Sequence, residues 1–135
     1  MKACIVILSL CYLIFLVCIC RAEVLFHKAM DTKDIELLAQ AQHLNPFSSE
    51  YFYGEYRLDH NLSALVHAIQ LEPTKAAYHM YYGLELLERV PRTPLTDQEA
   101  VTEICKGARL KSYSQIYHSA CEGYKAIIPI PSSSL

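Results

Sequence analysis

Apolar side chains follow two different patterns along this chain, and the pattern changes at Arg21. Residues 3–20 form one uncharged, almost wholly apolar stretch of eighteen residues. A helix of that length is just long enough to cross the hydrocarbon core of a bilayer, and it is long for the core of a secretion signal. The stretch therefore predicts a helix that takes the chain to a membrane, either as a signal peptide or as a single-span anchor.

The residues that end this stretch bear on whether it is removed. Cys20 and Ala22 are small residues three positions and one position before the Ala22–Glu23 bond, which is the pattern that a signal peptidase requires. The pattern favours cleavage after Ala22 over a retained anchor, and a buried core helix is the least favoured of the three alternatives. Residues 1–22 are thus assigned to a signal peptide or membrane anchor. The protein is expected to be exported, in the periplasm or another extracytoplasmic space, or anchored by residues 3–20.

Beyond residue 22, apolar residues recur at steps of three and four, the spacing of amphipathic helices. This pattern predicts helices at 34–44, 49–58, 62–71, 75–89, 97–110 and 114–127, and residues 23–30 form a further short helix or continue the apolar one. Thr96 and Glu99 have the spacing of a capping box, so one helix is expected to begin at Asp97. Residues 129–135, with two prolines and three serines, are expected to form a flexible tail.

Three segments of the chain share one frame, in which a leucine and a tyrosine stand seven residues apart with a turn between them. A tiny residue precedes each leucine by three positions. The residues of the frame are Ala41, Leu44, Pro46 and Tyr51, then Ala68, Leu71, Pro73, Tyr78 and Gly83, then Gly107, Leu110 and Tyr117. A recurring frame of this kind predicts antiparallel helical hairpins, in which the tiny residue lets two helices approach closely and the tyrosine joins the core. The predicted fold is all-α, with a repeat domain over residues 23–128.

The segment from Asn61 to Gly83 resembles a tetratricopeptide repeat. The small, large, small and proline positions of that family are matched by Ala64, Leu65, Ala68, Leu71 and Pro73, and the following helix has Tyr78 and Gly83. The likeness extends over residues 34–127, and the third frame departs from it with Gly107 in place of alanine and Ser112 in place of proline. The resemblance implies a short solenoid of stacked hairpins. The repeats are also similar to short repeat domains of bacterial envelope proteins, including those attached to O-antigen-ligase-like membrane proteins.

The resemblance implies a non-catalytic module that binds a protein or peptide partner in the cell envelope. In such a solenoid the first helix of each pair lines a concave face. The residues expected near that face are Tyr53, Arg57, Met80, Leu84 and Ser119. A face of this composition suits an extended peptide or a partner helix, and the alternative is that these residues are buried against a neighbouring hairpin. A second functional hypothesis is an accessory, anchored subunit of a membrane glycan-assembly system.

Other function classes find little support in the sequence. The six histidines include no pair with the spacing of a helical metal site, so neither a metal nor a cofactor is expected. An enzyme would need a polar pocket that joins His79 or His118 to a carboxylate, and no enzymatic function is predicted. The chain beyond residue 22 has a net charge of −4 and no basic cluster, which disfavours nucleic-acid binding.

Two of the six cysteines, Cys105 and Cys121, lie outside the apolar stretch. They fall on consecutive antiparallel helices, at similar distances from the turn that joins these helices. A disulfide between them would close a loop of about 16 residues. The alternatives are this disulfide and two buried free thiols, and the sequence favours the free thiols.

Overall fold

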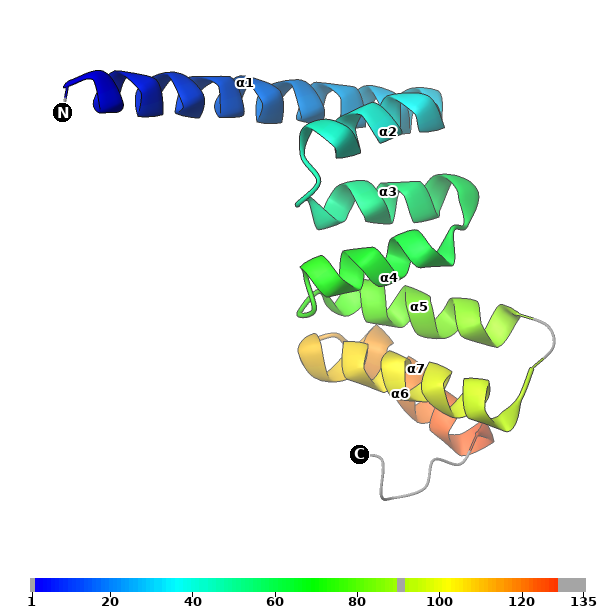
Figure 1. The fold of residues 1–135 in the computed structure, drawn as a ribbon. Helices are drawn as coiled ribbons and strands as arrows, with labels where there is room; N and C mark the ends of the chain where they lie inside the picture. Colours follow the sequence, from blue (N-terminus) through cyan, green and yellow to red (C-terminus); the bar gives the residue numbers. More distant parts are fainter. Residues whose placement is uncertain (1, 90–91, 129–135) are drawn as a thin grey trace. The chain divides into compact units, whose positions relative to one another are not determined.

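The computed structural model describes residues 2–89 and 92–128, with the side chains from residue 5 onward, and this part of the chain is helical without strands. The helices are α1 (Lys2–Thr32), α2 (Ile35–Leu44), α3 (Ser49–Asp59), α4 (Leu62–Leu71), α5 (Ala76–Glu88), α6 (Pro94–Leu110) and α7 (Gln115–Ile127) (Figure 1). The all-α prediction is confirmed, and the ends of α2 to α5 and of α7 agree with the sequence pattern to within one residue. The expected tail, residues 129–135, lies outside the described residues.

The chain divides into two compact units, residues 1–61 and residues 62–135, which we call unit 1 and unit 2. Unit 1 contains α1 to α3, and unit 2 contains α4 to α7. The boundary expected after residue 22 does not interrupt the structure, because α1 runs as one helix from Lys2 to Thr32. Residues 23–30 therefore continue the apolar helix rather than form a separate one.

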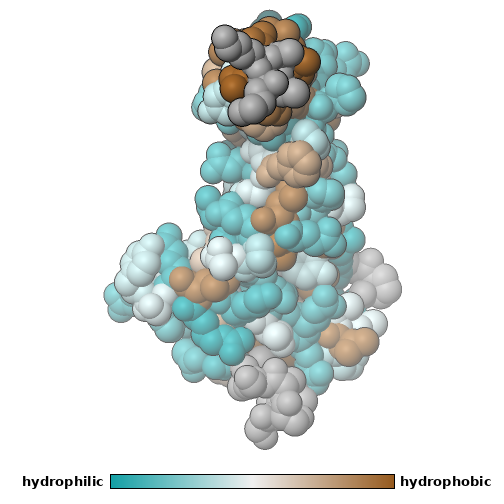
Figure 2. Space-filling view, turned by 60° about the vertical axis from the view of Figure 1, so that its left-hand side comes forward, coloured by the Kyte–Doolittle hydropathy of each residue, from teal (hydrophilic) through white to brown (hydrophobic). Residues whose placement is uncertain are grey.

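The first two-thirds of α1 expose apolar side chains on all sides. Residues 5–32 are long and apolar enough to cross a membrane. Figure 2 shows hydrophobic side chains around the forward-facing end of α1, whereas most of the remaining surface in this view is hydrophilic. A helix that is apolar around its whole circumference needs either a protein core or lipid around it, and the described part of the chain supplies no such core here.

The last third of α1 forms part of the core of unit 1. Ala22 and Ala29 are fully buried and pack with Leu38, Ala41 and Tyr51 of α2 and α3. The side chain of alanine is a single methyl group, so two helices that meet at alanines can pack closely. Ala41, which was expected where two helices approach closely, lies in this core, and Ala22 and Ala29 add α1 to it.

Tyr51 connects α3 to α1. Its ring stacks on that of Phe26 at a centroid distance of 4.8 Å, and its hydroxyl donates a 2.9 Å hydrogen bond to Glu23. Burial, and then the hydrogen bond to Glu23, raise the pKa of Tyr51 to about 12. The tyrosine therefore remains a hydrogen-bond donor over the whole physiological pH range.

In unit 2, α5 and α6 approach each other closely at a glycine. A Cβ atom on Gly83 would lie 2.5 Å from the carbonyl oxygen of Ala100 and 2.6 Å from a side-chain carbon of Ile104. Gly107 of α6 has the same role toward α5, because its Cβ would lie 2.9 Å from the carbonyl oxygen of Ala76. The expected close approach at Gly107 is therefore made to the preceding helix α5.

The start of α6 differs from the prediction. The helix begins at Pro94, three residues before Asp97, and its capping box is formed by Thr93 and Thr96. Proline is favoured in the first turn of a helix, because its fixed φ is helical and its missing N–H has no partner to lose there. Thr96 is thus the third helical residue, and the predicted box of Thr96 and Glu99 was wrong.

We expect Gly83→Ala to lower the free energy of unfolding by about 2 kcal/mol, because the added methyl group meets backbone atoms of α6 that cannot move aside easily. Gly123→Ala is the matched control. Gly123 is also helical, but nothing lies within 4 Å of a Cβ there, so this change should stabilise the protein by about 0.5 kcal/mol through the lower entropy of the unfolded chain. Chemical denaturation followed by circular dichroism measures both. Equal effects of the two substitutions would contradict the close approach.

Candidate functional site

The residues expected on a concave face are divided between the two units. Met80 is only 8 % exposed and belongs to the core of unit 2, and Leu84 packs against that core. Tyr53 and Arg57 belong to α3 of unit 1, where Tyr53 is half-buried, and Ser119 is exposed on α7. The prediction was wrong for Met80, because α5 uses this side of the helix to pack against α6. Burial against a neighbouring helix, the alternative expectation, describes Met80 and Leu84.

The leucine and tyrosine positions of the three repeat frames are not equally buried in the structure. Tyr51 and Tyr78 are both 1 % exposed, as expected of core tyrosines. Tyr117 is only half-buried, and Leu110 is exposed. The third frame, which departs most from the pattern in sequence, therefore also contributes least to the core.

The buried histidine His79 joins three parts of unit 2. Its Nε2 lies 2.8 Å from the carbonyl oxygen of Pro73, and its Nδ1 lies 2.5 Å from a carboxylate oxygen of Glu103 on α6. A carbonyl oxygen only accepts hydrogen bonds, so Nε2 carries a proton. When Glu103 is ionised, Nδ1 must donate as well, and the two side chains form a buried ion pair between α5 and α6.

The charge state of Glu103 supports this ion pair. The hydrogen bond from His79, together with the nearby positive charges of His79 and Lys106, holds the pKa of Glu103 below its ordinary value, although burial opposes this shift. His79 has no exposed surface. The pair joins a histidine to a carboxylate, as an enzyme site would, but a substrate could not reach the histidine. Its geometry suits holding α5 against α6.

His118 repeats one of the contacts of His79. Its Nε2 lies 2.9 Å from the carbonyl oxygen of Ser112, six residues earlier, just as His79 contacts Pro73 six residues earlier. The two histidines occupy the same position of the repeat frame. A contact to the carbonyl of the preceding turn is therefore a structural reason for histidine at this position. Among the described residues, no cluster of histidine, cysteine and acidic side chains is arranged to hold a metal.

Cys105 of α6 and Cys121 of α7 are joined by a disulfide. Of the two alternatives left by the sequence, the structure contains the disulfide, not the free thiols that the sequence favoured. Both cysteines are buried beside Met80 in the core of unit 2. Three other cysteines, at positions 11, 18 and 20, are free thiols on α1.

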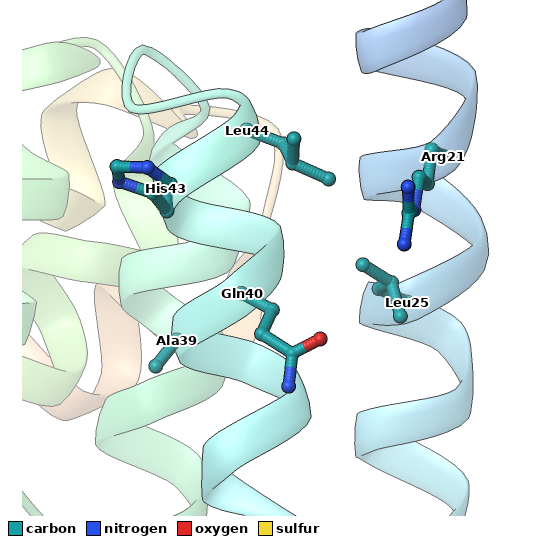
Figure 3. A pocket seen from close by; sticks show the side chains of 6 residues that line it. All are labelled: Arg21, Leu25, Ala39, Gln40, His43 and Leu44. Carbon is teal, nitrogen blue, oxygen red and sulfur yellow. The ribbon is translucent and has the colours of Figure 1, made fainter.

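A groove of about 410 Å³ lies between α1 and α2 in unit 1. Its lining residues are Arg21 and Leu25 from α1 and Ala39, Gln40, His43 and Leu44 from α2. Figure 3 shows Leu25 and Leu44 pointing toward each other across the groove, with Gln40 reaching from α2 toward α1 and His43 turned away. The groove is thus apolar at its base, with the guanidinium of Arg21 beside it. No signal in the repeat frame points to this site, because it depends on α1 packing against α2.

The His79–Glu103 pair makes the free energy of unfolding depend on pH. Because the folded state lowers the pKa of Glu103 from 4.5, the pair stabilises the fold above about pH 4.5, and this stabilisation is lost as the pH falls through the lower pKa of the folded state. We expect Glu103→Gln to lower the free energy of unfolding by about 2 kcal/mol at neutral pH and to weaken the acid dependence. Glu88→Gln, on the exposed end of α5, is the control and should change neither. Denaturation series at several pH values test this; an unchanged acid dependence in Glu103→Gln would contradict it.

The disulfide should stabilise unit 2 mainly by restricting its unfolded state. Replacing both cysteines, as Cys105→Ser with Cys121→Ser, is expected to lower the free energy of unfolding by about 3 kcal/mol. A reducing agent should produce a similar loss in the unsubstituted protein and none in the double variant. Insensitivity of the unsubstituted protein to the reducing agent would contradict this role of the disulfide.

Comparisons with known proteins add no assignment. No protein-family model matches the chain, and no curated protein matches it. The resemblance to tetratricopeptide repeats therefore depends on the repeat frame in the sequence. An all-helical fold with an apolar N-terminal helix is the basis from which function has to be inferred.

Proposed function

We propose that this protein is a non-catalytic binding module that is anchored in a membrane by α1 and that holds a protein or peptide partner outside the cytoplasm. The observation that supports this most directly is the continuity of α1. One helix contains both the apolar stretch and the buried alanines Ala22 and Ala29 of unit 1. The anchor and the folded domain thus share an element.

The packing of α1 favours a retained anchor over cleavage after Ala22. Cleavage would remove Ala22 from the core and leave ten helical residues, 23–32, to cover α2 and α3. Isolated helices of that length are marginal in water, and the new chain terminus would place a positive charge at the edge of the core. The proposal therefore takes the anchor as retained, contrary to the preference of the sequence pattern.

The disulfide is relevant to the side of the membrane on which unit 2 lies. Disulfides persist in oxidising, extracytoplasmic compartments and are rare in the cytosol. The bond between Cys105 and Cys121 therefore supports an orientation with the start of α1 on the cytoplasmic side and unit 2 on the far side. This agrees with the expected location in the cell envelope.

Unit 2 also offers a surface for a partner at the turn between α6 and α7. A groove of about 260 Å³ there is lined by residues that include Lys111, Tyr113 and Tyr117. The Tyr113 side chain is 85 % exposed, and Ile116 beside it is 80 % exposed. Exposed aromatic side chains next to a positive charge are typical of protein-binding surfaces, and the nearby disulfide limits the movement of this turn.

The second hypothesis, an accessory subunit of a membrane glycan-assembly system, shares the retained anchor. The continuity of α1 favours both hypotheses equally, since each needs a domain held at a membrane. They differ in the partner, which would be an integral membrane protein of glycan assembly in the second case. Identification of the partner therefore separates them.

Two measurements on the full chain in native membranes test the proposal. We expect intact-mass spectrometry to find residues 1–22 still present, and we expect the chain to stay in the membrane pellet after alkaline carbonate extraction. A photoreactive amino acid at position 113 should capture one specific protein. The same group at Ser119, which the sequence pattern placed near the partner-binding face, is tested beside it. A chain that begins at Glu23 would refute the anchor, and an absence of specific cross-links from both positions would refute the binding module.

A further inference from the structure

The end of unit 1 that faces the apolar part of α1 has the features of a membrane-contacting surface. The side chains of Arg21 and Leu44 line the same groove, so the C-terminal end of α2 lies level with Arg21. Figure 1 shows the α2–α3 turn, residues 45–48, on the side of unit 1 from which the N-terminal part of α1 projects. Phe47 lies in this turn and is 78 % exposed.

The length of the apolar stretch fixes the depth of these residues relative to a bilayer. Eighteen helical residues, 3–20, extend about 27 Å, close to the roughly 30 Å of a hydrocarbon core. Arg21 is the next residue and therefore falls at the level of the lipid phosphates. Leu44 and the following turn, being level with Arg21, fall at the same depth, which is where aromatic side chains are enriched in membrane proteins.

Among the residues that the structure describes, Arg21 has no counter-ion. Its guanidinium makes no ion pair or hydrogen bond with any described residue, and its planar fork fits a phosphate with two parallel hydrogen bonds. Leu25, Ala39 and Leu44 give the groove an apolar base, and Gln40 can add a further donor. A phosphate attached to an apolar body matches this arrangement better than a free ion does.

We propose that the end of unit 1 formed by Arg21, Leu44 and Phe47 lies against the bilayer, with Phe47 in its interface and the headgroup of an anionic phospholipid in the α1–α2 groove. This inference rests on the proposed anchoring by α1. It adds a second attachment of the soluble domain, so that unit 1 is held against the membrane surface and not merely tethered to it.

The position of Phe47 can be tested with a single fluorophore, because the chain contains no tryptophan. Full-length Phe47→Trp protein is reconstituted in vesicles that carry spin-labelled lipids, with the label near the headgroup. We expect the fluorescence to fall by about twofold, as for a ring at the interface. Ile35→Trp is the matched control, since Ile35 begins α2 and lies about 14 Å farther from the membrane along that helix, so its fluorescence should change little.

The phospholipid site is tested by substitution of Arg21. Native mass spectrometry of full-length protein released from nanodiscs of phosphatidylglycerol and phosphatidylcholine measures which lipid stays bound. We expect Arg21→Gln to reduce the preference for phosphatidylglycerol by about tenfold, the effect of losing a charge-assisted, bidentate pair. Lys28→Gln removes the same charge from the same helix two turns farther out and should leave the preference unchanged.

The possible outcomes separate this inference from the anchoring itself. Release of the chain by alkaline carbonate would overturn the anchor and this inference together. A chain that stays in the membrane but shows equal quenching at positions 47 and 35, or equal lipid preference in the two charge variants, would overturn only this inference. Displacement of bound phosphatidylglycerol by millimolar inorganic phosphate would assign the groove to the free ion and would also overturn it.

Discussion

The burial of one alanine-bearing side of α1 against α2 and α3 is the interaction on which unit 1 depends. Ala22 and Ala29 lie two turns apart on α1 and bring its backbone close to α2. Tyr51 then stacks on Phe26 and binds Glu23, so that α3 is held to the same helix. Without the last third of α1, unit 1 would keep only the hairpin of α2 and α3, which is too small a core to be stable alone.

Unit 2 reaches a stable core by other means. Its helices α5 and α6 meet at Gly83 and Gly107, where the missing side chains allow backbone contact. The buried pair of His79 and Glu103 fixes the register of these two helices, and the disulfide attaches α7. A buried ion pair contributes more to the choice of one arrangement than to net stability, because the cost of removing two charges from water offsets much of their attraction. Small domains commonly add such cross-links to a limited core.

Much of the fold could be predicted from the sequence, because apolar spacing and prolines mark helices locally. The bounds of α2 to α5 and the burial of Tyr51 and Tyr78 are examples. The start of α6 was wrong, because Thr93 and Thr96 both suit a cap and only the geometry of Pro94 decides between them. The placement of Met80 was wrong for a different reason. The side of α5 that is buried is decided by its packing against α6. The repeat frame describes the turn between two helices and does not tell which side of a helix another helix will cover. The α1–α2 groove was missed on the same ground.

Because α1 is one continuous helix, the direction in which unit 1 faces depends on the number of residues between the apolar stretch and Ala22. Each residue of an α-helix turns the chain by about 100° and advances it by about 1.5 Å. One residue inserted or deleted between the apolar stretch and Ala22 would therefore swing unit 1 around the axis of α1 by more than a quarter of a turn, with almost no change in its height. A flexible linker would absorb such a change, but a continuous helix transmits it. The number of residues in this short segment is consequently as constrained as their chemistry. It sets the direction in which unit 1 faces at the membrane surface.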